Sequence, residues 1–445
     1  MYVVLQFKEE FMKKIALLFV LLVCALMCSC VRQIPDIGGS EEIELYPKSV
    51  GLEFTSNKDG TCSVTGRGRC TDARIVIPAV SPDGKTVTTI GEEAFCADKT
   101  LVSVTLPETL LKVESNAFRY CQRLFEVINL SKLEIDDNLL GYSGYYGGIG
   151  EYAKEIHNGP GKMERINGLI FYKMDGENYV VAYDGSDSDI VFPANWHGES
   201  YFLLDDLLGF DEKNPNRRIT SVTFPDNALV KNIGNSAFKN CRALTTVSFG
   251  KNCNIDSIGL AAFDGCSKLS AVNFETGNTL KSIGTEAFSR CSNLYKFDFS
   301  LLENLETIER SAFSGCDSLT SVNLRASVRE IGEAAFASCF DLAIFTFEEG
   351  SSITSIPRSM LSCSSLTEIR IPEGVTEIGG SAFSSSAIKT VYLPKSLKTV
   401  WYHPFLGSDL ETVYYYGTPE EYQEIEFYSP LSPSPTIVYN YDPKK

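Results

Sequence analysis

The sequence contains few of the residues on which enzymes and metal sites depend. Only three histidines (His157, His197 and His403) and two tryptophans occur among 445 residues, and the histidines lack the spacing of a zinc motif. A phosphate-binding loop, a dinucleotide-binding fingerprint, a nucleophile elbow and a zinc-protease helix are all missing from the sequence. We therefore expect no enzyme activity, no cofactor and no bound metal.

Positive charge is also scarce, since 40 Lys and Arg stand against 57 Asp and Glu, for a net charge of −17. An acidic surface repels phosphate backbones, so we expect no nucleic-acid partner. The alternative, which the charge favours, is that it serves simple solubility. The acidic stretch 184–189 lacks the ligand-and-glycine pattern of a known calcium loop, which favours a solvated turn.

Long apolar runs are missing after the first thirty residues. Two lysines precede an apolar run from Ile15 to Leu26, which is too short to span a membrane and is typical of a signal peptide. We expect residues 1–29 to be the signal and residues 30–49 a linker. The following Cys30 resembles the lipidated cysteine of bacterial lipoproteins, which implies attachment to the membrane by lipid alone. An ordinary secretory signal is the alternative.

An internal repeat dominates the rest of the chain. The pattern I-G-x-x-A-F-x-x-C-x-x-L-x-x-V-x-F/L recurs in ten copies with spacings near 25 residues. The copies begin at Ile90, Val113, Ile233, Ile258, Ile283, Ile308, Ile331, Ile356, Ile378 and Val400. Because one copy cannot bury its apolar face alone, the copies must stack into a solenoid.

Each position of the repeat has a physical role. Val247 and Phe249 alternate with Ser248, which predicts a short strand with one side inward and parallel pairing between copies. The glycine, as at Gly234, predicts a tight bend that other residues would strain. The phenylalanine, as at Phe238, is expected to fill the interior.

This repeat resembles the BspA-type leucine-rich repeats of bacterial surface antigens, over residues 50–130 and 219–445. The resemblance implies a leucine-rich-repeat solenoid, made mainly of short parallel β-strands with tight turns and short helical turns. Family members are surface or secreted proteins, and some bind matrix proteins such as fibronectin or fibrinogen.

The resemblance therefore implies a monomeric, surface-anchored protein that binds host or microbial macromolecules, either a matrix protein or a glycan. Its expected location is the outer membrane or surface of a Gram-negative bacterium. Two alternatives stay open: a glycan-capturing lipoprotein of a nutrient-uptake system, in which Tyr142, Tyr145 and Tyr146 would stack on sugars, and a structural envelope protein.

The solenoid is expected to have two caps and one interruption. The expected divisions are a cap hairpin at 50–89, repeats at 90–130 and 219–412, a degenerate repeat with an insertion at 131–218, and a C-terminal cap at 413–445. Asp175-Gly176 predicts a hairpin within the insertion. In the C-terminal cap, Thr418 and Pro419 predict the start of a short helix. The insertion could carry a binding function or be a tolerated elaboration.

We assign seven cysteines to one repeat position, which predicts a ladder of buried free thiols. They are Cys121, Cys241, Cys266, Cys291, Cys316, Cys339 and Cys363, with Ser386 and Ser408 at the same position in later copies. Cys62 and Cys70 are different, because they flank a turn and could form a disulfide; whether they do is left open.

The outward positions of the predicted strands form a row that is the candidate binding face. The row contains Thr223, Ser248, Asn273, Asp298, Asn323, Thr346, Arg370 and Tyr392. Arg and Tyr are favoured anchors in interfaces, so Arg370 and Tyr392 are the main candidates, with Trp401 expected nearby. The alternative is that the row only solvates one side of the sheet.

Overall fold

The computed structural model describes residues 48–135, 146–208 and 218–441, all of them in the second of two units, Lys48–Lys445. The predicted signal peptide and Cys30 lie outside the described residues. Within the described part, no helix has both the length and the apolar character needed to cross a membrane.

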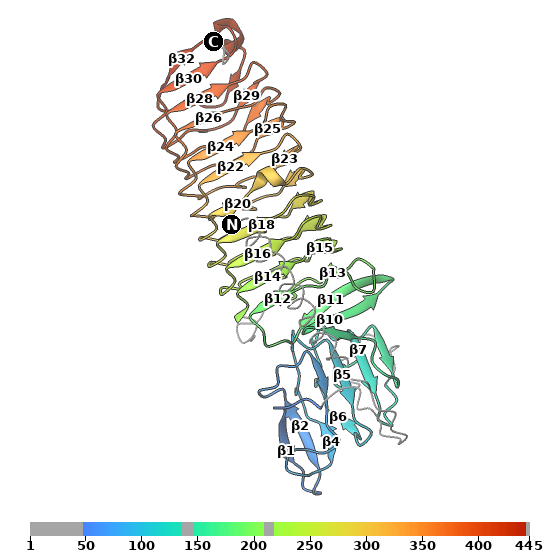
Figure 1. Ribbon diagram of the computed structural model, residues 1–445. Helices are drawn as coiled ribbons and strands as arrows, with labels where there is room; N and C mark the ends of the chain where they lie inside the picture. Colours follow the sequence, from blue (N-terminus) through green and yellow to red (C-terminus); the bar gives the residue numbers. More distant parts are fainter. Residues whose placement is uncertain (1–47, 136–145, 209–217, 442–445) are drawn as a thin grey trace, which may run out of the picture. The chain divides into compact units, whose positions relative to one another are not determined.

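The unit is a β-solenoid in which most turns supply one longer strand and one strand of two residues (Figure 1). The longer strands form one series of parallel sheets and the short strands form another. Helices in the described residues are short, as at η1 (Tyr146–Gly148), η3 (Phe299–Leu301) and α2 (Pro419–Gln423). The predicted class, a solenoid of short parallel strands, is confirmed.

The strands after the interruption follow the repeat. The longer strands are β12 (Asp189–Val191), β14 (Ser221–Phe224), β16 (Thr246–Phe249), β18 (Ala271–Phe274), β20 (Lys296–Phe297), β22 (Ser321–Leu324), β24 (Ile344–Phe347), β26 (Glu368–Arg370), β28 (Thr390–Leu393), β30 (Thr412–Tyr415) and β32 (Thr436–Val438). The short strands are β15 (Asn232–Ile233), β17 (Ser257–Ile258), β19 (Ser282–Ile283), β21 (Thr307–Ile308), β23 (Glu330–Ile331), β25 (Ser355–Ile356), β27 (Glu377–Ile378), β29 (Thr399–Val400) and β31 (Glu426–Phe427).

The N-terminal turns begin with an antiparallel hairpin of β1 (Glu53–Ser56) and β2 (Cys62–Gly66). β2 continues in parallel to β4 (Val87–Ile90) and β6 (Lys112–Val113). The longer strands here are β3 (Arg74–Val76), β5 (Ser103–Leu106), β7 (Glu126–Asn129) and β8 (Glu155–His157), in that order in one sheet.

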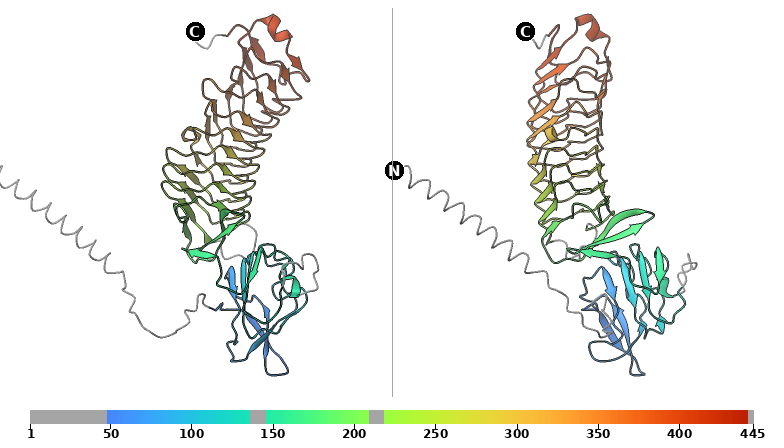
Figure 2. Two further views of the ribbon diagram at one scale, coloured as in Figure 1. Left: turned by 90° about the vertical axis from the view of Figure 1, so that its right-hand side faces the viewer. Right: turned by 45° about the vertical axis from the view of Figure 1, so that its right-hand side comes forward.

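The interruption contains the hairpin that Asp175-Gly176 predicts. β10 (Leu169–Met174) pairs antiparallel with β11 (Glu177–Tyr183), and the sheet is completed by β9 (Glu164–Ile166) and β13 (Phe202–Leu203). Figure 2 shows this hairpin leaving the stack of turns. β12 then pairs with β14, so Ile190 returns the chain to the repeat register.

Two ladders fill the interior. The rings of Phe263 and Phe288 stack with their centroids 5.1 Å apart, and Phe313 follows Phe288 at 5.2 Å. Beside them, the thiol of Cys291 points at the carbonyl oxygen of Phe263 in the preceding turn, at 3.2 Å. Cys266, Cys316 and Cys339 repeat this contact. The predicted ladder of buried free thiols is confirmed for these residues. Including Cys363 in the ladder was wrong: Cys363 is only partly buried and has the left-handed backbone (φ 58°) that Ser338 has directly before Cys339. The buried Ser364 takes the ladder position in that turn.

The physical reason expected for the repeat glycine is wrong. The left-handed backbone occurs two residues later, at Ser236 (φ 55°) and its equivalents. Gly234 is needed because consecutive turns approach closely at this point: a Cβ there would lie 2.5 Å from the carbonyl oxygen of Leu203. The glycine therefore serves contact between turns and not the bend itself.

The C-terminal cap contains the helix that its sequence predicts. Thr418 is the N-cap of α2, with Pro419 in the first turn. The Thr418 hydroxyl accepts from the Glu421 amide at 3.2 Å, and the Glu421 carboxylate accepts from the Thr418 amide at 2.8 Å. This reciprocal pair is a capping box, which fixes the start of the helix.

Candidate functional site

Most of the predicted outward row is in register. The strand pairings align Thr223 with Ser248 and Asn273, Asn323 with Thr346, and Arg370 with Tyr392. The small polar members bond to one another: Asn273 Nδ2 donates to Ser248 Oγ at 3.3 Å, and Thr346 Oγ1 donates to Asn323 Oδ1 at 2.5 Å. In the middle of the solenoid the row is a self-bonded polar ladder.

Asp298 does not belong to the row, which corrects the sequence prediction. β20 ends at Phe297, and Asp298 is the N-cap of η3. The Asp298 carboxylate accepts from the amide and the hydroxyl of Ser300, at 3.0 and 2.6 Å. The strand therefore ends before Asp298, whose side chain starts η3 instead of extending the sheet.

Arg370 and Tyr392 belong to a group of aromatic residues that we call the tyrosine cluster: Arg370, Tyr392, Tyr414, Tyr416 and Tyr441. Arg370 is exposed, and its guanidinium lies 3.6 Å from the centre of the Tyr392 ring. Tyr392 stacks on Tyr414 at 5.0 Å, and Tyr441 lies 4.7 Å from Tyr414. The expectation that Tyr392 is exposed is therefore wrong: its neighbours cover it, and only 8% of it is accessible.

Trp401 lies apart from this cluster. It follows β29, which belongs to the series of short strands, whereas β26 and β28 belong to the longer strands. Trp401 stacks on the exposed Tyr428 at 4.4 Å, and the exposed Tyr402 meets Tyr428 edge-on at 5.5 Å. The indole nitrogen donates to Glu377. The prediction that Trp401 lies near Arg370 is therefore wrong, because the two residues lie on separate surfaces.

Cys62 and Cys70 are both buried free thiols in the structure. The Sγ atom of Cys62 points at the carbonyl oxygens of Lys85 and Thr86, each at 3.6 Å. Burial is the main cause that raises the pKa of Cys70. Both side chains therefore fill the interior of the N-terminal cap.

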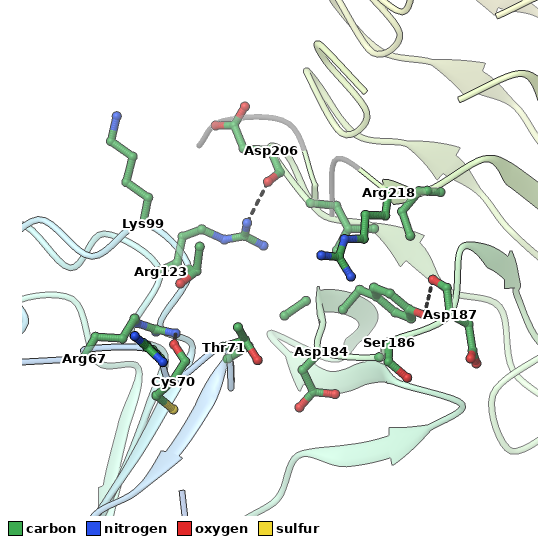
Figure 3. A pocket seen from close by; sticks show the side chains of 18 of the residues that line it. Arg67, Cys70, Thr71, Lys99, Arg123, Asp184, Ser186, Asp187, Asp206 and Arg218 are labelled. Carbon is green, nitrogen blue, oxygen red and sulfur yellow. Dashed lines mark hydrogen bonds between the residues drawn. The ribbon is translucent and has the colours of Figure 1, made fainter. Parts of the chain in front are cut away.

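A cavity of about 650 Å³ lies where the cap, the first repeats and the interruption meet (Figure 3). It is lined by the loop 67–73, by Lys99 and Arg123 in turns that precede strands, by the end of β11 and the loop after it (182–187), and by Asp206 and Arg218. Five lining residues are basic (Arg67, Arg69, Lys99, Arg123, Arg218) and three are acidic (Asp184, Asp187, Asp206). Basic residues therefore outnumber acidic ones in this lining, whereas the whole chain has a net charge of −17.

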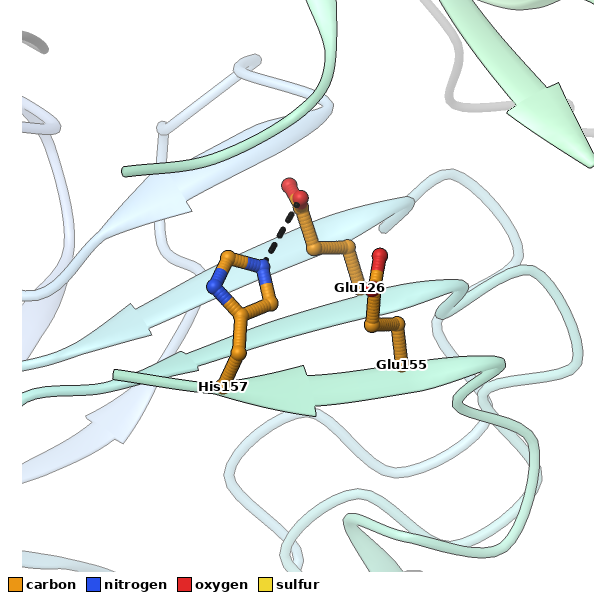
Figure 4. A group of neighbouring side chains, drawn as sticks. All are labelled: Glu126, Glu155 and His157. Atoms are coloured by element: carbon orange, nitrogen blue, oxygen red, sulfur yellow. Dashed lines mark hydrogen bonds and ion pairs between the residues drawn. The ribbon is translucent and has the colours of Figure 1, made fainter. Parts of the chain in front are cut away.

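Glu126, Glu155 and His157 form a second group of polar side chains, on the adjacent strands β7 and β8 (Figure 4). One ligand atom from each lies within 4.8 Å of the others, which is a spacing that a divalent cation could use. The buried Glu126 already accepts from the Lys162 amide at 2.7 Å and lies 3.2 Å from His157 Nε2.

The ammonium group of Lys162 competes with a cation in this group. It forms an ion pair with Glu155, which also accepts from the Tyr172 hydroxyl at 3.2 Å. These contacts therefore hold the segment at Lys162 against β7. A cation would have to displace a lysine that is already in place.

Sequence reasoning missed both the cavity and this polar group. Glu126 and His157 are 31 residues apart, and His157 lies in the interruption, where the repeat register gives no guide. The cavity residues come from separate loops for the same reason. One available signal was the basic residue three or four positions before several longer strands, as at Lys99, Arg123 and Arg218.

The sequence matches the BspA type leucine rich repeat region over residues 78–143, 214–302 and 298–411, which is more than half of the chain. Comparison with curated proteins finds no match. A leucine rich cell surface protein from Faecalibacterium prausnitzii A2-165 is 22% identical, with 86% of this chain and 98% of that chain covered and a TM-score of 0.36. A leucine-rich repeat protein from Bacteroides ovatus ATCC 8483 is 18% identical, with coverages of 88% and 99% and a TM-score of 0.42. The repeat match, over more than half of the sequence, shows that this chain belongs to the family of BspA-type leucine-rich repeat proteins.

Proposed function

We propose that this protein is a surface-anchored binding protein that holds a macromolecular partner, preferably a protein, on the tyrosine cluster. The observation that carries the proposal is the exposed Arg370 stacked on Tyr392 at one end of a regular parallel sheet. Arg and Tyr, with Trp, are enriched among the residues that contribute most to binding in protein interfaces. The rest of the outward row consists of short polar side chains, which contribute little contact area.

The stacking prepares these side chains for binding. The Tyr392 ring holds the Arg370 guanidinium at 3.6 Å, so little side-chain entropy remains to be lost on association. Tyr414, Tyr416 and Tyr441 are partly exposed around it and offer both ring surface and hydroxyl groups. A preorganised cation surrounded by aromatic rings suits an acidic or aromatic patch on a partner.

The proposed location is the cell surface, with attachment through a lipid on Cys30. The motif around Cys30 and the membership in the repeat family support this location. Metabolic labelling of the expressed protein with a palmitate analogue, followed by fractionation, tests it. We expect the label to disappear in Cys30→Ala and to persist in Cys62→Ala.

The binding proposal is tested by measuring affinity for purified matrix proteins, including fibrinogen and fibronectin, on an optical biosensor. Arg370→Ala and Tyr414→Ala should each weaken binding about 30-fold or more, as is typical of interface anchors. Arg242→Ala is the matched control, because Arg242 is exposed on a turn outside the cluster. Wild-type affinity in both cluster variants would overturn the proposed site.

Glycan capture is the second candidate, and a separate observation favours it. Trp401 and Tyr428 form a stacked pair with Tyr402 beside it, and flat exposed rings of this kind bind the apolar faces of sugars. Of the tyrosines expected to serve this role, Tyr142 and Tyr145 lie outside the described residues. Tyr146 is partly buried against the N-terminal core. A glycan array with Tyr428→Ala, which should abolish any signal that depends on this pair, distinguishes the two candidates.

A further inference from the structure

The cavity at the interruption of the repeat contains donor groups that the protein leaves unused. Arg123 donates through Nη1 to the carbonyl oxygen of Asp206 at 2.7 Å and through Nη2 to that of Val181. Its Nε atom is buried and finds no partner among the described residues. The Nη2 atom of Arg67 is also buried and also has no hydrogen-bond partner among the described residues. Buried donors without acceptors are costly, so two of them beside one cavity indicate a missing acceptor.

The charges in the cavity indicate the sign of that acceptor. Arg123 and Arg218 extend toward one another from opposite sides of the cavity (Figure 3). Within the part of the chain that the structure describes, no carboxylate forms an ion pair with Arg123. Two cations that face each other across an opening repel, and an anion between them removes this repulsion. Burial lowers the pKa of Arg123 to about 10, chiefly by desolvation, and the charges of Asp206 and Asp205 offset this shift only in part.

The cavity also contains acceptors, and these restrict the ligand further. Asp187 lines the cavity, and the backbone oxygen of this residue is held by the Tyr183 hydroxyl at 3.1 Å. Asp184 lines the same loop and is fixed by Arg165 at 2.7 Å. Carboxylates accept hydrogen bonds and repel a bare anion. A ligand that suits both sets of groups therefore carries an acid group and also hydroxyl donors.

The size of the cavity agrees with such a molecule. A volume of about 650 Å³ lies within the usual range for small-molecule sites, roughly 300–1,000 Å³. Thr71, Ser186 and Gln122 add neutral polar groups to the lining, and Leu207 and Ile219 add apolar ones. We propose that this cavity binds a small anionic sugar, whose acid group lies between Arg123 and Arg218 and whose hydroxyl groups face Asp187.

The acid group can be a carboxylate or a phosphate, because guanidinium groups bind both through paired hydrogen bonds. This site is separate from the tyrosine cluster and does not depend on the proposed function. Arg370→Ala should therefore leave binding in the cavity unchanged.

Titration calorimetry on the purified protein without its signal peptide tests the proposal with four probes: D-glucuronate, glucose 6-phosphate, glucose and inorganic phosphate. We expect at least one of the two acidic sugars to bind tenfold or more tighter than both glucose and phosphate. The better of the two acidic sugars identifies the acid group. Equal binding of glucose would overturn the role of the arginines, and equal binding of inorganic phosphate would overturn the recognition of a sugar.

Two variants locate the site. Arg218 is exposed, so Arg218→Gln should leave folding intact while it weakens binding of the acidic sugar roughly 10-fold to 100-fold. Asp187→Asn should weaken the acidic sugar but not inorganic phosphate. Arg242→Gln is the matched control for loss of an exposed arginine, and circular dichroism monitors folding. Wild-type affinity in Arg218→Gln, or no binding of either acidic sugar at millimolar concentration, would overturn the proposal.

Discussion

Raising the pH above 9 should unfold this protein through its buried thiols. Burial raises the pKa of Cys241 and Cys339 to about 12, from an ordinary value of 9.0, because a thiolate cannot be hydrated in the core. Burial likewise raises the pKa of Cys253 to about 12. The folded protein keeps these thiols neutral, whereas the unfolded chain releases their protons. The stabilisation is therefore complete below about pH 9 and is lost as the pH rises toward 12.

The size of the effect follows from these values. At pH 10, one unit above the pKa of the unfolded chain, each such thiol lowers the free energy of unfolding by about 1.4 kcal/mol. Desolvation also raises the pKa of Cys121 to about 12. Together with Cys241, Cys253 and Cys339 it gives a loss of about 6 kcal/mol at pH 10. That loss is comparable with the whole stability of an ordinary domain, roughly 5–15 kcal/mol.

Urea unfolding followed by circular dichroism, at pH 7 and pH 10 with a reductant present, measures this loss. In Cys241→Ala the difference between the two pH values should shrink by about 1.4 kcal/mol, whatever the variant loses in packing at both. Ser386→Ala is the control, because Ser386 occupies the ladder position without a thiol. An undiminished difference in Cys241→Ala would show that this thiol ionises normally in the folded protein and would refute the burial argument.

Three further substitutions test the interior and the cap by thermal or urea unfolding. Gly379→Ala should cost about 1–3 kcal/mol, because the new Cβ would lie 2.5 Å from the backbone nitrogen of Arg358; Gly159→Ala, with its nearest atom 3.7 Å away, should cost under about 0.5 kcal/mol. Phe288→Ala should cost about 3–5 kcal/mol by opening the phenylalanine stack, and a cost under about 1 kcal/mol would contradict that packing. Thr418→Ala should cost about 1 kcal/mol through loss of the helix cap, and no change in stability would mean that the capping box is not formed in solution.

The repeat could be predicted because its positions recur. When a phenylalanine or a cysteine stands at one position in many copies, its neighbours are other copies of itself, so a single sequence reveals the contacts of Phe288 and Cys291. The same argument predicts the strand register. Hairpins and caps were predictable for a different reason, since the signals at Asp175-Gly176 and Thr418 are local.

The predictions about the candidate site failed where the environment is not periodic. Tyr392 occupies an outward position, but Tyr414 and Tyr441 cover it, and Tyr441 comes from the last described segment. Asp298 has the sequence position of an outward residue, but β20 ends before it and its carboxylate caps η3. The cavity is lined by six separate segments with no shared register, and only the three-dimensional structure brings them together.

The constant register of the middle turns makes the span of the protein adjustable. Thr246 pairs with Ala271, and Ser257 with Ser282, so one turn is a unit of 25 residues whose neighbours on both sides present the same surface. Deleting or duplicating such a unit should preserve every ladder while it changes the separation between the anionic-sugar cavity and the tyrosine cluster by about 4.8 Å per turn. Relatives with different numbers of turns would therefore hold two bound molecules at different distances from each other, without a change in either site.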